Sequence, residues 1–131
     1  MSWEPVDAPG LAAMPAFCHA AIAGDFVYVS GMIGADAERR LVPGGVGPEM
    51  TQALRNAELA LEAAGATLAD VCKVHVHLAV SGAQAREAMN AAYLEVFGAR
   101  PPARITVGTT ELALGAAVEI DCVAHLGKEH R

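Results

Sequence analysis

The 131-residue sequence predicts one α+β domain over residues 1–131. Three observations support this fold class. Strand-like segments occur near both ends of the chain, a central segment alternates strictly between apolar and polar residues, and two segments carry apolar residues at helical spacing. The sequence contains no repeat, low-complexity segment or linker that would divide the chain.

The first two elements are predicted to be strands, over Phe17–Ala23 and Phe26–Ser30. Gly24-Asp25 lies between them and predicts a tight hairpin, because glycine adopts a positive φ at little cost. Residues 35–47 are rich in glycine and charge and are expected to form a loop; a short strand near Leu41 is left open.

A helix is predicted to begin at Pro48, because proline suits the first helical turn and Glu49 suits the positive end of the helix dipole. Gly65 is a fitting C-terminal stop. The apolar residues between them lie on one stripe, which consists of Met50, Leu54, Ala57, Leu61 and Ala64.

The segment Asp70–Val80 has the two-residue period of a strand with one face on a core. Lys73, His75 and His77 share its polar face. The opposite face is apolar and consists of Cys72, Val74, Val76, Leu78 and Val80.

A second helix is predicted to begin with a capping box formed by Ser81 and Gln84 and to end at Gly98. Its buried stripe consists of Ala85, Met89, Ala92, Tyr93 and Val96. Two strands, Arg104–Thr110 and Ala117–Leu126, are expected to close the chain as one hairpin that turns around Leu112-Ala113.

The composition limits the functions that we consider. The net charge of −6 argues against nucleic-acid binding, which needs a basic face, and against an anionic membrane surface. There is no visible signal peptide, no apolar run of membrane-spanning length and no CxxC motif, so we expect a protein of the reducing cytoplasm. Only 18% of residues are charged, which favours burial of part of the surface in an oligomer.

Arg104 and Glu119 are the main candidates for chemistry. Each is predicted to point away from the apolar side of its own strand, and the expected hairpin would place them diagonally within reach of each other. Arginine fits a carboxylate bidentately, and a nearby glutamate can hold or deprotonate water. An ordinary ion pair with Glu119 or Asp121 is the alternative reading of Arg104.

With these residues, the chain resembles the reactive intermediate deaminase family (RidA, formerly YjgF). Four segments carry the resemblance, and their order and spacing are more specific than any one of them: Phe17-Cys18-His19-Ala20 with Ala23-Gly24-Asp25, Val27-Tyr28-Val29-Ser30-Gly31, Asn90-Ala91-Ala92-Tyr93, and Pro102-Ala103-Arg104 with Val118-Glu119-Ile120.

The resemblance implies a chorismate-mutase-like fold, in which a mixed sheet carries two helices on one face and a homotrimer forms through the other, with pockets between subunits. It also implies hydrolysis of 2-imino acids to 2-keto acids and ammonia without a cofactor. Arg104 would then bind the substrate carboxylate and Glu119 would position the attacking water.

The same resemblance implies that Phe17, Ser30, Gly31, Asn90 and Thr106 bind the substrate. Two of these residues depart from the family pattern, which usually has tyrosine at Phe17 and often cysteine at Thr106. The phenyl wall remains at Phe17 but its hydroxyl is lost, so the substrate preference is open.

Two other patterns have chemical readings. His75 and His77 form an HxH pair that could bind a metal if His19 or His125 came close, but an incomplete ligand set favours a place in the subunit interface, and we expect no metal. Cys18 and His19 cannot form a catalytic dyad, because neighbours on a strand point to opposite faces.

Three alternative functions stay open beside the small-substrate deaminase. The protein could deaminate a larger enamine or imine in one pathway, or it could be a non-catalytic trimer that binds 2-keto acids. A ribonuclease or translation-inhibitor activity, attributed to relatives, is disfavoured by the acidic charge.

Overall fold

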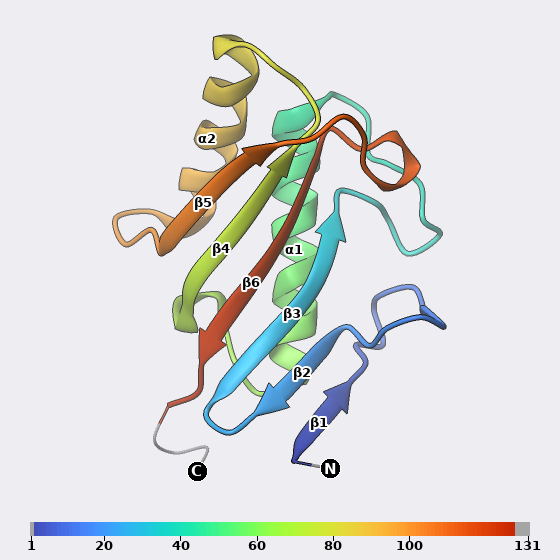
Figure 1. Ribbon diagram of the computed structural model, residues 1–131, viewed down its shortest axis with the longest axis vertical. Helices are drawn as coiled ribbons and strands as arrows, with labels where there is room; N and C mark the ends of the chain where they lie inside the picture. Colours follow the sequence, from blue (N-terminus) through green and yellow to red (C-terminus); the bar gives the residue numbers. More distant parts are fainter. Residues whose placement is uncertain (1, 128–131) are drawn as a thin grey trace.

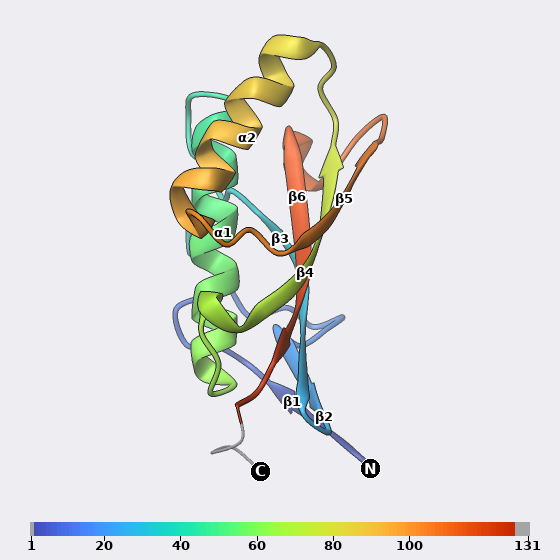
Figure 2. The ribbon, with the colours of Figure 1, turned by 90° about the vertical axis from the view of Figure 1, so that its left-hand side faces the viewer.

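The computed structural model describes residues 2–127 and shows a mixed sheet with two helices on one face, as Figures 1 and 2 show. This confirms the α+β class and the layering that the resemblance implied. In chain order the elements are β1 (Trp3–Val6), β2 (Ala20–Ala23), β3 (Phe26–Ile33), α1 (Val46–Ala63), β4 (Val71–Leu78), α2 (Ala83–Phe97), β5 (Ala103–Gly108) and β6 (Val118–His125).

The strand order across the sheet is β1-β2-β3-β6-β4-β5, as Figure 1 shows. The expected hairpin of the last two strands is therefore wrong, because β4 lies between them. It pairs in parallel with β5 and antiparallel with β6. The connection after β5 passes over β4, so short-range turn signals at Leu112-Ala113 did not reveal the pairing. A 3₁₀ turn lies at Ala113–Gly115 instead.

The N-terminal strands differ from the prediction at their ends. The hairpin at Gly24 is confirmed, with φ of 60° at this glycine, but β2 begins at Ala20, and Phe17 lies in the preceding loop. A further strand, β1, pairs with β2.

β3 continues past Ser30 to Ile33 and has an irregular register between Val29 and Met32. Ser30 and Gly31 therefore lie in a bulged region rather than at a strand end. Near Leu41 there is an isolated bridge to Ala35.

Helix α1 buries the whole predicted stripe, from Met50 to Ala64. Helix α2 buries Met89, Ala92 and Tyr93 of its predicted stripe and ends at Gly98, where φ is 62°. Its predicted capping box is wrong. The N-cap is Gly82, with φ of 99° and no side-chain hydrogen bond. A left-handed backbone at that position suits glycine, so the chain turns into α2 without help from Ser81.

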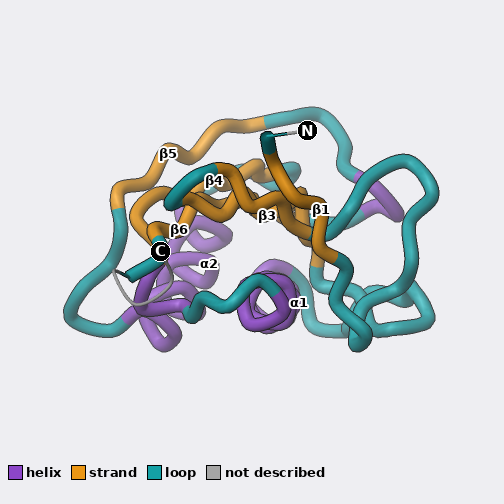
Figure 3. Tube along the Cα trace, turned by 90° about the horizontal axis from the view of Figure 1, so that it is seen from below, coloured by secondary structure: helices purple, strands orange, loops and turns teal. Residues whose placement is uncertain are grey.

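The core fills the space between the helices and one face of the sheet, and Figure 3 shows both helices on the same side of the strands. β4 contributes Val74, Val76 and Leu78, as predicted. Cys72 is exposed, contrary to the prediction, because the register of β4 against β6 shifts between Val71 and Lys73. The opposite face of the sheet is left open by the helices. No helix within residues 2–127 is long and apolar enough to cross a membrane.

Candidate functional site

Arg104 lies at the start of β5 on the helix-covered face of the sheet, directly beside the buried Val74. Its Nη1 donates a hydrogen bond of 2.8 Å to Oδ1 of Asn90 and lies 3.8 Å from the sulfur of Met89. The guanidinium carbon lies 4.8 Å from the centre of the Tyr93 ring. Among the described residues Arg104 forms no ion pair, so the guanidinium charge is available to bind an anion. The expected alternative of an ion pair with Glu119 or Asp121 is not present there.

Two buried hydroxyl groups have no hydrogen-bond partner among the described residues: the hydroxyl of Tyr93, whose ring contacts Arg104, and the Oγ1 of Thr106, two residues after Arg104 on the same face of β5. Burial raises the pKa of Tyr93 to about 12, against the opposing effect of the Arg104 charge. The phenol therefore stays protonated near neutral pH. We name Arg104, Asn90, Thr106 and Tyr93 the arginine half-site.

The sequence pattern predicts Tyr93 as a core residue and gives no sign of its contact with Arg104. The helical spacing that marked it as buried is the same spacing that places it one turn from Asn90, so the two residues share a face of α2. The sequence does not show that Tyr93 contacts Arg104, because that contact depends on β5 lying beside this face of α2.

We expect the Tyr93 ring, rather than its hydroxyl, to hold the guanidinium in position. Tyr93→Leu should raise KM for an imine substrate about 3- to 30-fold, because a cation–π contact is lost. Tyr93→Phe keeps the ring and should change KM less than about threefold. Steady-state kinetics of both variants would check this, and equal effects of the two would contradict it.

Glu119 lies on β6, on the open face of the sheet, where it pairs with His77 of β4 and Ile33 of β3. A Cβ atom at residue 31 would lie 2.7 Å from Oε2 of Glu119 and 3.1 Å from its carboxyl carbon. Any side chain there would displace the carboxylate, so Gly31 makes room for it. Gly31 and Glu119, two residues that the resemblance implied separately, therefore lie against each other.

Ser30 and Phe17 flank this glycine. The Ser30 hydroxyl donates a hydrogen bond of 2.6 Å to the carbonyl of Cys18, and the Ser30 amide donates to the carbonyl of His19. Phe17 is 44% exposed and lines a small cavity together with Gly31. We name Glu119, Gly31, Ser30 and Phe17 the glutamate half-site.

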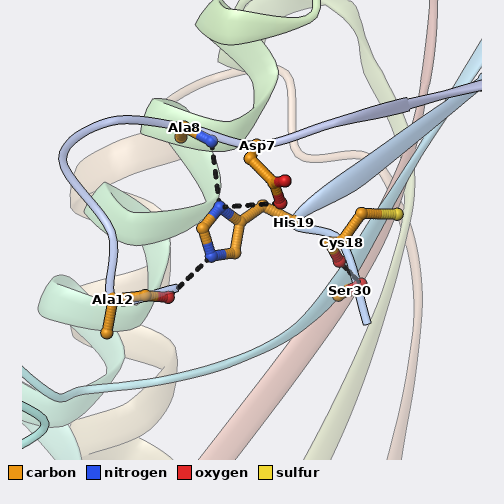
Figure 4. Close-up of polar contacts among 6 residues, drawn as sticks. All are labelled: Asp7, Ala8, Ala12, Cys18, His19 and Ser30. Carbon is orange, nitrogen blue, oxygen red and sulfur yellow. Dashed lines mark hydrogen bonds and ion pairs between the residues drawn. The ribbon is translucent and has the colours of Figure 1, made fainter. Parts of the chain in front are cut away.

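Buried His19 fixes the loop that carries Phe17, as Figure 4 shows. Its Nδ1 accepts a hydrogen bond of 2.9 Å from the amide of Ala8, and its Nε2 lies 2.8 Å from the carbonyl oxygen of Ala12. These partners define a neutral ring with its proton on Nε2. Asp7 is 3.8 Å from Nδ1 but cannot form an ion pair with a nitrogen that carries no proton. The Cys18 thiol points away from the ring, so the two side chains form no dyad, although both residues precede β2 and the expected strand geometry is not the reason.

We expect His19→Ala to lower the free energy of unfolding by about 2–4 kcal/mol, because one buried and one half-buried backbone group lose their partners. Chemical denaturation would measure the change. Asp7→Asn is the matched control and should change the stability by less than about 0.5 kcal/mol, because the Asp7 carboxyl is exposed. A loss with Asp7→Asn as large as that with His19→Ala would show that an ion pair is present.

The two half-sites lie on opposite faces of the sheet. Arg104 pairs with Val74, whose side chain is in the core, whereas Glu119 pairs with His77 on the open face. The expected diagonal contact between Arg104 and Glu119 within one chain is therefore wrong. The reason is that the apolar residues of β5, Ile105 and Val107, face the open side, so Arg104 points to the side that is the core in the other strands.

His75 and His77 share the open face with Asp121. The Nδ1 of His75 lies 2.9 Å from one Asp121 oxygen, and the Nε2 of His77 lies 3.3 Å from the other. Within residues 2–127, no three His, Cys, Asp or Glu side chains are grouped so that they could hold a metal ion. His19 is committed to Ala8 and Ala12 and does not join the pair.

We expect any deaminase activity to survive treatment with EDTA, because the histidine pair is engaged by Asp121 rather than arranged around an ion. The rate of ammonia release before and after chelation and gel filtration would test this. Loss of the rate, followed by recovery with zinc, would contradict it.

Arg104 lines a cleft of about 360 Å³ between α2 and the loop before β5. A larger cleft, of about 680 Å³, lies on the other side of Pro101 and Pro102 but holds none of the predicted site residues. By volume alone, the larger cleft would be the candidate binding site. We choose the cleft at Arg104 instead, because it contains a charged group whose neighbours are neutral.

Known proteins resemble this chain over nearly its whole length. The family model described as Endoribonuclease L-PSP matches residues 7–126. A RutC family protein of Pyrococcus horikoshii is 36% identical over 104 residues, which cover 79% of this chain and 81% of that protein. The 2-iminobutanoate/2-iminopropanoate deaminase of Rattus norvegicus is 37% identical over 117 residues, which cover 88% of this chain and 84% of the rat protein.

The solved structures give the same result for the fold. The crystal structure of RidA from an Antarctic Psychrobacter species superposes with a TM-score of 0.85 at 27% identity, covering 94% of this chain and 99% of that one. The fold that the resemblance implied, a mixed sheet with two helices on one face, is thereby confirmed. From the family model, the relatives and the shared fold together, this chain belongs to the RidA (YjgF) family, which the Endoribonuclease L-PSP model describes.

Proposed function

We propose that this protein hydrolyses small 2-imino acids to 2-keto acids and ammonia, without a cofactor, in pockets shared between the subunits of a homotrimer. The observation that carries the proposal is the Arg104 guanidinium, which is held by Asn90 and Tyr93 and left without a carboxylate partner among the described residues. The name of the rat relative supports the same reaction.

The chemistry requires both half-sites. Arg104 would bind the substrate carboxylate through its planar fork. The Ser30 hydroxyl already donates a hydrogen bond to the carbonyl of Cys18, so its oxygen can accept a hydrogen bond from the N–H of the imine. Glu119 would orient water for attack on the imine carbon and return a proton to the departing ammonia, so that the C=N bond is replaced by C=O. Phe17 would close the pocket as an apolar wall.

A second copy of the chain would bring the half-sites together. Within one chain the sheet separates Arg104 from Glu119, and one small substrate cannot touch both. The open face of the sheet also carries large exposed apolar side chains that a partner subunit would cover. These residues are Phe26, Tyr28, Ile105 and Val107.

An amino-acid oxidase with semicarbazide as the imine trap provides the test. The protein should lower the yield of trapped imine and speed the release of ammonia. Static light scattering at micromolar concentration should give the mass of a trimer. A protein that binds pyruvate but leaves the yield of trapped imine unchanged would be a binder rather than a deaminase, and a monomer would rule out the shared pockets.

A further inference from the structure

The cleft around Arg104 is apolar apart from two side chains. Its lining residues are Asn90, Tyr93, Leu94, Pro101, Pro102 and Arg104. No acidic residue and no second cation is among them. Tyr93 is buried, and its ring lies against the Arg104 guanidinium and the Phe97 ring, so it backs the cleft as an apolar support for Arg104. A bound molecule would therefore meet one charge, one amide and a largely apolar wall.

The two polar side chains, Asn90 and Arg104, are hydrogen-bonded to each other. Oδ1 of Asn90 accepts the hydrogen bond from Arg104, which fixes the guanidinium at one end of the cleft. A carboxylate bound to Arg104 leaves the remainder of the molecule against Leu94 and the two prolines. The volume of about 360 Å³ is much more than a methyl side chain needs.

Leu94 lines the cleft and is not part of the core. It lies four residues after Asn90 on α2, so both occupy one face of the helix. Leu94 is 48% exposed, although leucine is a strongly apolar residue. Its exposed surface is available to an apolar group that enters the cleft.

We propose that the preferred substrates are 2-imino acids with a branched or extended apolar side chain, and that Leu94 determines this preference. The inference rests on the proposed function and names its substrate class. Each methylene buried in the cleft should raise kcat/KM about fourfold. A substrate with an acidic side chain should react poorly, because its second carboxylate would be buried without a partner.

Imines generated from alanine, leucine and glutamate would test the preference. The kcat/KM for the leucine-derived imine should exceed that for the alanine-derived imine by roughly 10- to 60-fold. The glutamate-derived imine should give the lowest value of the three. A leucine-derived imine that reacts no faster than the alanine-derived one would overturn the inference.

Leu94→Ser should reduce the ratio of leucine- to alanine-derived kcat/KM about tenfold. Leu59→Ser is the matched control, since Leu59 is also an exposed helical leucine but lies on α1, outside the cleft, and this variant should leave the ratio unchanged. Circular dichroism and thermal unfolding would verify that both variants are folded. An unchanged ratio in folded Leu94→Ser would overturn the role of Leu94.

Binding of 2-keto acids tests the specificity of the cleft independently of the proposed reaction. If no imine is hydrolysed faster, the proposed function fails, and calorimetry with 2-keto acids then decides the specificity of the cleft. The keto acid with the leucine side chain should bind at least about tenfold more tightly than pyruvate. Equal affinities would show that the cleft does not select apolar side chains.

Discussion

Replacing Arg104 with alanine should lower kcat/KM by roughly 10²-fold or more. The variant loses two charge-assisted hydrogen bonds to the substrate carboxylate, each worth about 1.5–3 kcal/mol. The loss should affect KM strongly, because the carboxylate is present in substrate and transition state alike. Arg104→Lys should restore little of the rate, since an ammonium group cannot reproduce the planar fork or the stacking on Tyr93.

Arg100→Ala is the matched control for this experiment. Arg100 precedes Arg104 by four residues but lines the other cleft, beyond the two prolines. Its removal should leave the steady-state parameters close to those of the unmodified protein. If Arg104→Ala instead deaminates imines at the original rate, or does not fold, then Arg104 has a structural role and the deaminase proposal loses its main support.

Much of the fold could be predicted because several segments have an unambiguous period. The stripe from Met50 to Ala64 and the alternation of Val74, Val76 and Leu78 both describe surfaces that are buried in the structure. Local signals also gave the hairpin at Gly24 and the end of α2 at Gly98, where a positive φ requires glycine or nearly so.

The pairing of the strands could not be predicted in the same way. A two-residue period tells which side of a strand is apolar, but not which layer covers that side. In β5 the apolar residues Ile105 and Val107 lie on the open face, and Arg104 points toward α2. Chain order suggested a hairpin with β6, whereas the parallel pairing with β4 is a non-local contact.

In the candidate site, too, individual residues could be predicted from the sequence, but the contacts between them could not. The strand pattern pointed to Arg104 and Glu119 and the resemblance added Gly31, each as an individual residue, and the structure shows Gly31 against Glu119. It also shows that Asn90 holds Arg104, a contact that depends on how α2 packs beside β5. Whether these residues act on a substrate stays a prediction.

Glu119→Gln should lower kcat by roughly 10²–10⁴-fold, because the variant keeps the size of the side chain but loses the acid–base group. Binding of a 2-keto acid should remain nearly intact, since Arg104 is unchanged. Asp121→Asn is the matched control: Asp121 is the next carboxylate on the same face but is engaged by His75 and His77, so most of the activity should remain. Equal losses in the two variants would contradict a specific role for Glu119.

The Arg104→Ala and Glu119→Gln variants should complement each other in mixed trimers. If Arg104 of one subunit and Glu119 of the next form each pocket, a trimer mixed from Arg104→Ala and Glu119→Gln chains contains pockets in which both residues are intact. Random reassembly of equal amounts makes this combination in about a quarter of the pockets, because each of the two subunits is the required one half of the time. Unfolding the variants together and refolding them should thus restore about a quarter of the original activity, whereas variants refolded separately and then combined should remain inactive.

The sheet separates Arg104 from Glu119 within one chain, so a single subunit cannot supply both residues to one small substrate. If the co-refolded chains form trimers but recover no activity, the pocket is not shared between subunits.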